Sequence, residues 1–193
     1  MIQIAVTGGI GSGKTVVSEI LRLLSIPVYN ADAESKRLTD SSPLIRQALT
    51  GRFGDDLYPA NGPLDKARLA SLIFAGKENL QFVNSIIHPV VLQDFIQWTD
   101  KLKLPVVAME SAILFESGFD QYVTHTICVS APLELRITRA MNRDAASREQ
   151  ILRRIAHQLP DKCKCERSNF VIYNDEIQPL IPQVEKIVEQ IRA

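Results

Sequence analysis

One short stretch of the chain, GGIGSGKT at residues 8–15, combines residue types that suit phosphate binding. It fits the pattern G-x-x-x-x-G-K-[ST] in full, with Gly8, Gly13, Lys14 and Thr15 at the required spacing. We expect the glycines at 8, 9, 11 and 13 to take positive φ, which lets backbone N–H groups approach phosphate oxygens. Lys14 supplies a positive charge for the β- and γ-phosphates, and Thr15 supplies a hydroxyl for Mg²⁺. The stretch therefore predicts a nucleotide site.

The residues on either side of this stretch predict the elements that hold it. Residues 2–6 form a β-branched run typical of a buried strand, and apolar residues recur at helical spacing in KTVVSEILRLL, which follows the loop. A helix that begins near Lys14 directs the positive end of its dipole at bound phosphates. The order strand, loop, helix is the context that this motif requires. The residues expected to contact the nucleotide here are Gly9, Ile10, Gly11, Ser12, Gly13, Lys14, Thr15 and Val16.

The composition of the 193-residue chain is typical of a globular protein, with 46% hydrophobic and 23% charged residues. Lys and Arg together number 22, as do Asp and Glu, so the formal net charge is +0. This balance gives no support to a nucleic-acid or membrane partner, and we expect neither. We recognise no signal peptide, and the apolar stretch 104–115 is too short to span a bilayer and carries Glu110. Three cysteines, an odd number, indicate reduced thiols and favour a cytoplasmic location.

Apolar strands that alternate with helices predict an α/β fold with a parallel sheet covered on both faces. Further strands are expected at 26–29, 105–109, 124–129 and 170–173, which gives a five-stranded, three-layer α/β/α arrangement. Helices are expected at 132–142, at 147–157 with Ser147 as N-cap, and at 177–191. The stretch 43–102 is mainly helical, and Pro89 is expected to start a new helix within it.

The domain organisation follows from the length of that helical stretch, which is too long for one crossover between two strands. We interpret it as an insertion that holds a second substrate. The polar, basic region from Arg143 to Ser168 predicts a mobile, helical lid, with Arg139 and Arg143 leading into it. We therefore expect a single domain over residues 1–193, with a core at about 1–35, 104–135 and 168–193, a helical insertion at about 36–103, and a lid at about 136–167.

Motifs that the chain lacks exclude some of the possible fates of the γ-phosphate. A switch GTPase needs Asn-Lys-x-Asp and a later Asp-x-x-Gly, and neither string occurs. A small chain with an insertion and a basic lid instead favours a small-molecule kinase, in which closure brings Arg side chains to the phosphate and excludes water. Arg139 and Arg143 lie four residues apart on one helical face and are the candidates for this role. Arg148, Arg153, Arg154 and Arg167 are further candidates, although for most of them a solvated surface position is the favoured interpretation.

Several separate stretches resemble the dephospho-coenzyme A kinase family over nearly the whole chain. They occur in the family's order and at its spacing, and the His-Pro, Leu-Phe-Glu and Ile-x-Asn elements are more specific than the loop. The stretches are TGGIGSGKT, Asn30-Ala31-Asp32, GPLDKARL from Gly62 with Ile73-Phe74, Asn84-x-x-x-His88-Pro89, Ile113-Leu114-Phe115-Glu116, Arg139-x-x-x-Arg143-Asp144, Gln158 and Val171-Ile172-x-Asn174.

The resemblance implies transfer of the γ-phosphoryl group of ATP, with Mg²⁺, to the ribose 3′-hydroxyl of dephospho-CoA. It also implies residue roles. Asp32 resembles the catalytic aspartate, and its alternative interpretation is an N-cap for a helix that starts at Ala33. Asn174 is expected to meet the adenine of ATP. Glu110 is expected either to hold Mg²⁺ through water or to be a simple charge at a strand end.

The same resemblance implies a set of residues for the acceptor, namely Asp32, Asp65, Arg68, His88 and Glu116. For His88, a histidine that caps a helix is the alternative. Two positions depart from the family's pattern. Asn30 stands where the family usually has a first aspartate, which leaves Asp32 as the one carboxylate there, and Ala112 replaces a proline without loss of a chemical group.

Two other functions fit the sequence. One is a kinase with AMP or a nucleoside as acceptor, although such an acceptor would call for an arginine-rich pocket near His88. The other is a sensor that binds ATP without turnover, which intact Lys14, Thr15 and Asp32 make less favourable.

Overall fold

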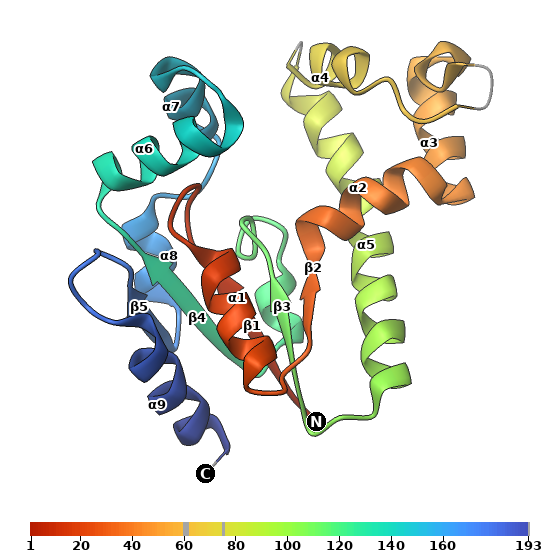
Figure 1. The fold of residues 1–193 in the computed structure, drawn as a ribbon. Helices are drawn as coiled ribbons and strands as arrows, with labels where there is room; N and C mark the ends of the chain where they lie inside the picture. The colour runs from red at the N-terminus through yellow and green to blue at the C-terminus, as the bar shows by residue number, and fades with distance from the viewer. Residues whose placement is uncertain (60–61, 75, 193) are drawn as a thin grey trace. The chain divides into compact units, whose positions relative to one another are not determined.

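A five-stranded parallel sheet is the framework of the protein in a computed structural model that describes residues 1–59, 62–74 and 76–192 (Figure 1). The strands lie in the order β2-β3-β1-β4-β5, and each neighbouring pair is parallel. This confirms the predicted α/β class, with small shifts at the strand ends. The strands are β1 (Ile2–Thr7), β2 (Val28–Asn30), β3 (Val106–Glu110), β4 (His125–Ser130) and β5 (Phe170–Tyr173).

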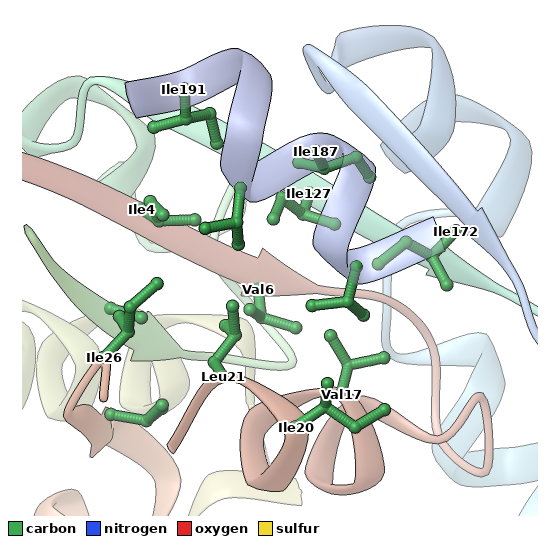
Figure 2. Packing of buried hydrophobic residues seen from close by; sticks show 14 of the residues in the cluster. Ile4, Val6, Val17, Ile20, Leu21, Ile26, Ile127, Ile172, Ile187 and Ile191 are labelled. Atoms are coloured by element: carbon green, nitrogen blue, oxygen red, sulfur yellow. The ribbon is translucent and has the colours of Figure 1, made fainter. Parts of the chain in front are cut away.

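One face of the sheet packs against α1 (Lys14–Leu23) and α9 (Leu180–Arg192). Figure 2 shows the apolar side chains of this layer, which come from the strands and from both helices. Because side chains alternate along a strand, Cys128 of β4 points to the opposite face, where α8 (Asp161–Arg167) contacts the strand. The labelled members of the cluster are Ile4, Val6, Val17, Ile20, Leu21, Ile26, Ile127, Ile172, Ile187 and Ile191.

The chain divides into two compact units. Met1–Asn30 and the chain from Lys103 onward form what we call the sheet unit, and Ala31–Leu102 forms the helical unit. The remaining helices of the sheet unit are η3 (Phe119–Tyr122), α6 (Leu133–Asp144) and α7 (Arg148–Ala156).

Helices α6 and α7 form a small helical pair with its own apolar contact, made by Ile137, Ala140 and Ile151. Ser147 caps α7 as predicted, because its hydroxyl accepts from the backbone N–H of Gln150 while the Gln150 side chain accepts from Ser147 N–H. Helix α8 was not predicted, since DKCKCER has no apolar periodicity.

The helical unit consists of α2 (Ala31–Ser41), α3 (Pro43–Phe53), η1 (Asp55–Leu57), α4 (Lys66–Phe74) and α5 (Lys77–Leu102). The expectation that Pro89 starts a new helix is wrong, because α5 runs through it. Buried side chains on both sides of the proline, Val83 and Phe95 among them, anchor α5, which contacts α2, α3 and α4. This packing outweighs the loss of one helical hydrogen bond at Pro89. In the described ranges, no helix combines the length and the apolar character needed to cross a membrane.

Candidate active site

The glycine-rich loop lies between the end of β1 and the first residue of α1. Gly8, Gly11 and Gly13 have φ of 145°, 76° and 98°, in the region that glycine tolerates best, as predicted. The expectation of positive φ at Gly9 is wrong. Gly9 is required for a different reason, because a Cβ there would lie 1.9 Å from Nη2 of Arg136.

Lys14 and Thr15 open α1 at the carboxyl-terminal edge of the sheet. Lys14 is 9% exposed, and its Nζ donates to the carbonyl of Gly9 at 3.3 Å, so the ammonium group lies back across the loop. The Thr15 hydroxyl donates to Oε1 of Glu110 at 3.0 Å. Glu110 ends β3 and is in register with Asn30 at the end of β2, so two strand ends and the start of α1 meet here.

A partly buried polar network that contacts the loop was not predicted. Arg136 of α6 is 5% exposed, and its Nε donates to the carbonyl of Ile10 at 3.0 Å. Asp161 of α8 accepts from Gly9 N–H at 2.9 Å and forms an ion pair with Arg136 at 3.1 Å. Gln158 accepts from Ile10 N–H at 3.1 Å. Arg136 of α6, Gln158 and Asp161 of α8 therefore satisfy the backbone at Gly9 and Ile10 and fix the shape of the loop.

Glu116, which we expected near the acceptor, is part of the support of α8. Its Oε1 accepts from the N–H of Leu159 at 2.8 Å and pairs with the fully buried Lys164 at 3.0 Å. Lys164 Nζ also donates to the carbonyl of Ala112 at 2.5 Å. Because an unpaired buried ammonium group is costly, these contacts tie α8 to the loop that follows β3.

Asn174, expected at the adenine, donates from Nδ2 to the carbonyl of Ser12 at 2.8 Å. Arg139 in turn donates to the backbone and side-chain oxygens of Asn174 at 3.3 and 3.4 Å and pairs with Glu176. The Arg139 side chain is 27% exposed, whereas the Arg143 side chain is 63% exposed. The Arg143 guanidinium pairs with Asp144 and holds the pKa of that carboxyl below its ordinary value by hydrogen bonding.

Comparison with known proteins gives the family. A model of the dephospho-CoA kinase family matches residues 2–179. The chain belongs to the dephospho-CoA kinase family. It is 48% identical to a dephospho-CoA kinase of Bacteroides fragilis strain YCH46 over 188 residues, covering 97% of this chain and 91% of the relative. It is 46% identical to that of Porphyromonas gingivalis over 194 residues, covering 100% and 96%. A crystal structure from Thermus thermophilus matches with a TM-score of 0.84 and 32% identity, covering 99% and 96%.

Membership of the dephospho-CoA kinase family confirms the predicted activity. The protein is a kinase that phosphorylates dephospho-CoA in CoA biosynthesis, with ATP as co-substrate. The match over nearly the whole chain favours this function over a nucleoside monophosphate kinase and over a sensor without turnover.

The other residues that the family resemblance marks belong to the helical unit. Helix α2 begins at Ala31, so Asp32 lies in its first turn, two residues beyond the end of β2. The N-cap interpretation of Asp32 is therefore wrong. His88 lies inside α5, so the interpretation as a helix cap is wrong as well, and burial lowers the pKa of its imidazole.

Asp65 and Arg68 lie at the start of α4. Asp65 accepts from the N–H of Arg68 at 2.9 Å, as a capping residue does. The Arg68 side chain forms an ion pair with Asp56 at 2.6 Å. Both side chains therefore have structural partners within the helical unit.

Gly9→Ala should distort the phosphate loop of this kinase where the loop packs against Arg136. The added methyl group would displace Arg136, and it would also lie 2.6 Å from Oδ1 of Asp161. We expect the free energy of unfolding to fall by about 1–3 kcal/mol and the KM for ATP to rise. Thermal melting and initial rates measure both effects. Gly51→Ala in α3 is the matched control, because its methyl group would meet nothing within 4 Å and should stabilise the helix by about 0.5–1 kcal/mol. Equal behaviour of the two variants would contradict this role of Gly9.

Proposed function

We propose that the protein transfers the γ-phosphoryl group of Mg·ATP to the ribose 3′-hydroxyl of dephospho-CoA in the cytoplasm. The observation that carries the nucleotide half of this proposal is the loop with Lys14 and Thr15 at the start of α1, beside the end of β3. Family membership supports the acceptor. The three cysteines are free, which is typical of a reducing compartment.

The pair Thr15 and Glu110 fits Mg²⁺. Glu110 is 4% exposed, and its Oε2 has no hydrogen-bond partner among the described residues. A hydroxyl and a carboxylate are the hard oxygen donors that this ion prefers, and it keeps several waters when bound. We therefore assign Thr15 as a ligand and Glu110 as a partner through water. When bound, the ion neutralises charge on the β- and γ-phosphate oxygens.

Most of the catalysis consists of positioning and charge stabilisation. Backbone N–H groups of Gly11 and of residues 13–15, at the start of α1, hold the β- and γ-phosphates, whereas those of Gly9 and Ile10 donate to Asp161 and Gln158. Lys14 stabilises the negative charge that develops on the leaving β-phosphate. Arg139 and Arg143 approach the transferring group when the lid closes and excludes water. Asn174, fixed against Ser12, faces the adenine.

The acceptor is activated by Asp32. Its carboxylate takes or orients the proton of the 3′-hydroxyl as the hydroxyl oxygen bonds to the γ-phosphorus and the bond to the β-phosphate oxygen breaks. We propose that Asp65, Arg68 and His88 of the helical unit bind dephospho-CoA, and that burial, which lowers the pKa of the His88 imidazole, favours its neutral form. Glu116 is left out of this set because its carboxylate is held by Lys164 and the N–H of Leu159.

The proposed function is tested by ADP release in a coupled assay with Mg·ATP. Dephospho-CoA, AMP, adenosine and no acceptor are offered in parallel to the same protein. We expect turnover with dephospho-CoA alone. Turnover with AMP would move the protein to the nucleotide kinases, ADP release without acceptor would make it an ATPase, and no release in any sample would favour a sensor.

Arg139→Ala should slow phosphoryl transfer more than Arg143→Ala does. Arg139 is the less exposed of the two and lies against Asn174, whereas Arg143 is mainly solvated and paired with its neighbour Asp144. We expect a loss in kcat of about 10²-fold or more for Arg139→Ala, and a rise in the ratio of ADP formed to CoA formed. Measuring both products shows the leak to water directly. An unchanged transfer rate would make Arg139 a surface residue.

A further inference from the structure

Two of the three cysteines are in contact although they lie on different elements of the sheet unit. Sγ of Cys128 on β4 is 2.9 Å from Sγ of Cys165 on α8, although the two are 37 positions apart in the chain. Cys163 lies on the same short helix, two residues before Cys165, and is also free. The function described above uses none of these thiols.

The two thiols differ in their access to solvent. Cys128 is fully buried, whereas Cys165 is partly exposed and lines a pocket of about 390 Å³. Ser130, Leu133 and Lys162 line the same pocket. A small reagent can therefore reach Cys165 but not Cys128. Burial raises the pKa of the Cys128 thiol, which also makes it the slower nucleophile toward an external reagent.

We propose that Cys128 and Cys165 form a reversible disulfide that ties α8 to β4. A disulfide needs sulfur atoms about 2.05 Å apart, so the thiols must approach by less than about 1 Å and the backbone moves little. The oxidant is a low-molecular-weight disulfide that enters from the pocket.

The reaction is two thiol–disulfide exchanges. The Cys165 thiolate attacks one sulfur of the reagent, forms a mixed disulfide and releases the first small thiol. The Cys128 thiolate then attacks Sγ of Cys165 and releases the second small thiol. The protein loses two protons and two electrons, and the reagent takes up both as its disulfide bond is reduced to two small thiols.

The consequence of the link follows from what α8 holds. The same helix carries Asp161, which accepts from Gly9 N–H, and Lys164, which pairs with Glu116. A covalent bond from Cys165 to the buried strand keeps the helix docked, so the support behind the phosphate loop is retained on heating. The link also closes a chain segment that contains α6 and α7, which reduces the entropy of the unfolded chain.

The test uses the full chain and 2-hydroxyethyl disulfide as the oxidant. After incubation, free thiols are alkylated under denaturing conditions and the digest is read by mass spectrometry. We expect one linked pair, Cys128 with Cys165, an alkylated Cys163, full reversal by dithiothreitol, and a rise in melting temperature on the order of 5 °C.

Cys163→Ala is the matched control and should behave like the wild type, whereas Cys165→Ala should form no internal disulfide. Cys128→Ala should stop the reaction at a mixed disulfide on Cys165, which tests the pair even if the buried substitution lowers stability. A disulfide that includes Cys163, a wild-type reaction that stops at the mixed disulfide, or a lower melting temperature of the oxidised protein would overturn the proposal.

Discussion

Lys14→Ala should remove most of the phosphoryl transfer activity. The ammonium group lies across the glycine-rich loop, 3.3 Å from the carbonyl of Gly9, and is 9% exposed. In such a site a positive charge is only weakly screened, so its attraction to the β- and γ-phosphates is strong. We expect kcat to fall by about 10²–10³-fold or more, with weaker ATP binding, measured by initial rates with dephospho-CoA and by nucleotide titration.

The control for this variant is Lys186→Ala, which removes an exposed lysine of α9 and should leave kinetics unchanged. The melting temperature of each variant shows whether the fold is retained. A folded Lys14→Ala protein with near-normal kcat would remove Lys14 from the catalytic machinery.

Asp32→Asn should reduce kcat far more than it raises the KM for either substrate. The change keeps the size of the side chain and its ability to form hydrogen bonds, but it removes the carboxylate that would accept a proton. Loss of a general base typically costs roughly 10²–10⁴-fold in rate. We expect a large effect on kcat and a small effect on KM because the carboxylate acts mainly in the transition state. Steady-state kinetics with both substrates varied measure it.

Glu34→Gln is the matched control, because Glu34 lies on the same helix α2 and pairs with the exposed Arg37. It should leave kcat unchanged. Because residue 30 is an asparagine, no second carboxylate at that position can compensate for Asp32→Asn. Near-normal kcat in Asp32→Asn would show that Asp32 is not the base.

The sheet and the loop could be predicted from the sequence because they depend on local patterns. Short β-branched runs, such as residues 2–6, mark the strands. The glycines at 8, 11 and 13 mark backbone conformations that other residues rarely take. Glu110 could be placed at a strand end because it directly follows such a run. Its contact with Thr15 was not predicted, because it depends on β3 lying next to β1 in the sheet.

The network behind the loop could not be predicted, because it depends on contacts between distant segments. Arg136 and Asp161 are 25 positions apart and meet at Gly9 and Ile10, far earlier in the chain. No local pattern marks either residue among the many charged residues between 136 and 167. The second glycine of Gly8-Gly9 is only a weak hint of this network. Gly9 does not have a positive φ, and a side chain is excluded there because the Arg136 guanidinium lies beside it.

Helix ends were misjudged where tertiary packing decides them. Pro89 is a strong local signal for a helix start, yet α5 continues through it because the helix packs along its length inside the helical unit. Helix α2 begins at Ala31, directly after β2, so Asp32 is already inside the helix and is not its N-cap. His88 and Asp32, which we interpreted as possible helix caps, therefore both lie inside helices.

The position of the transferred phosphate tests the central claim most directly. The product of a reaction with Mg·ATP and dephospho-CoA is isolated and its ¹H–³¹P correlation spectrum recorded, with the no-enzyme mixture as reference. The account predicts a new monophosphate coupled to the proton on the ribose 3′-carbon, formed in equal amount to ADP. A phosphate on the 2′-oxygen, on the pantetheine end, or only in the inorganic form would contradict it.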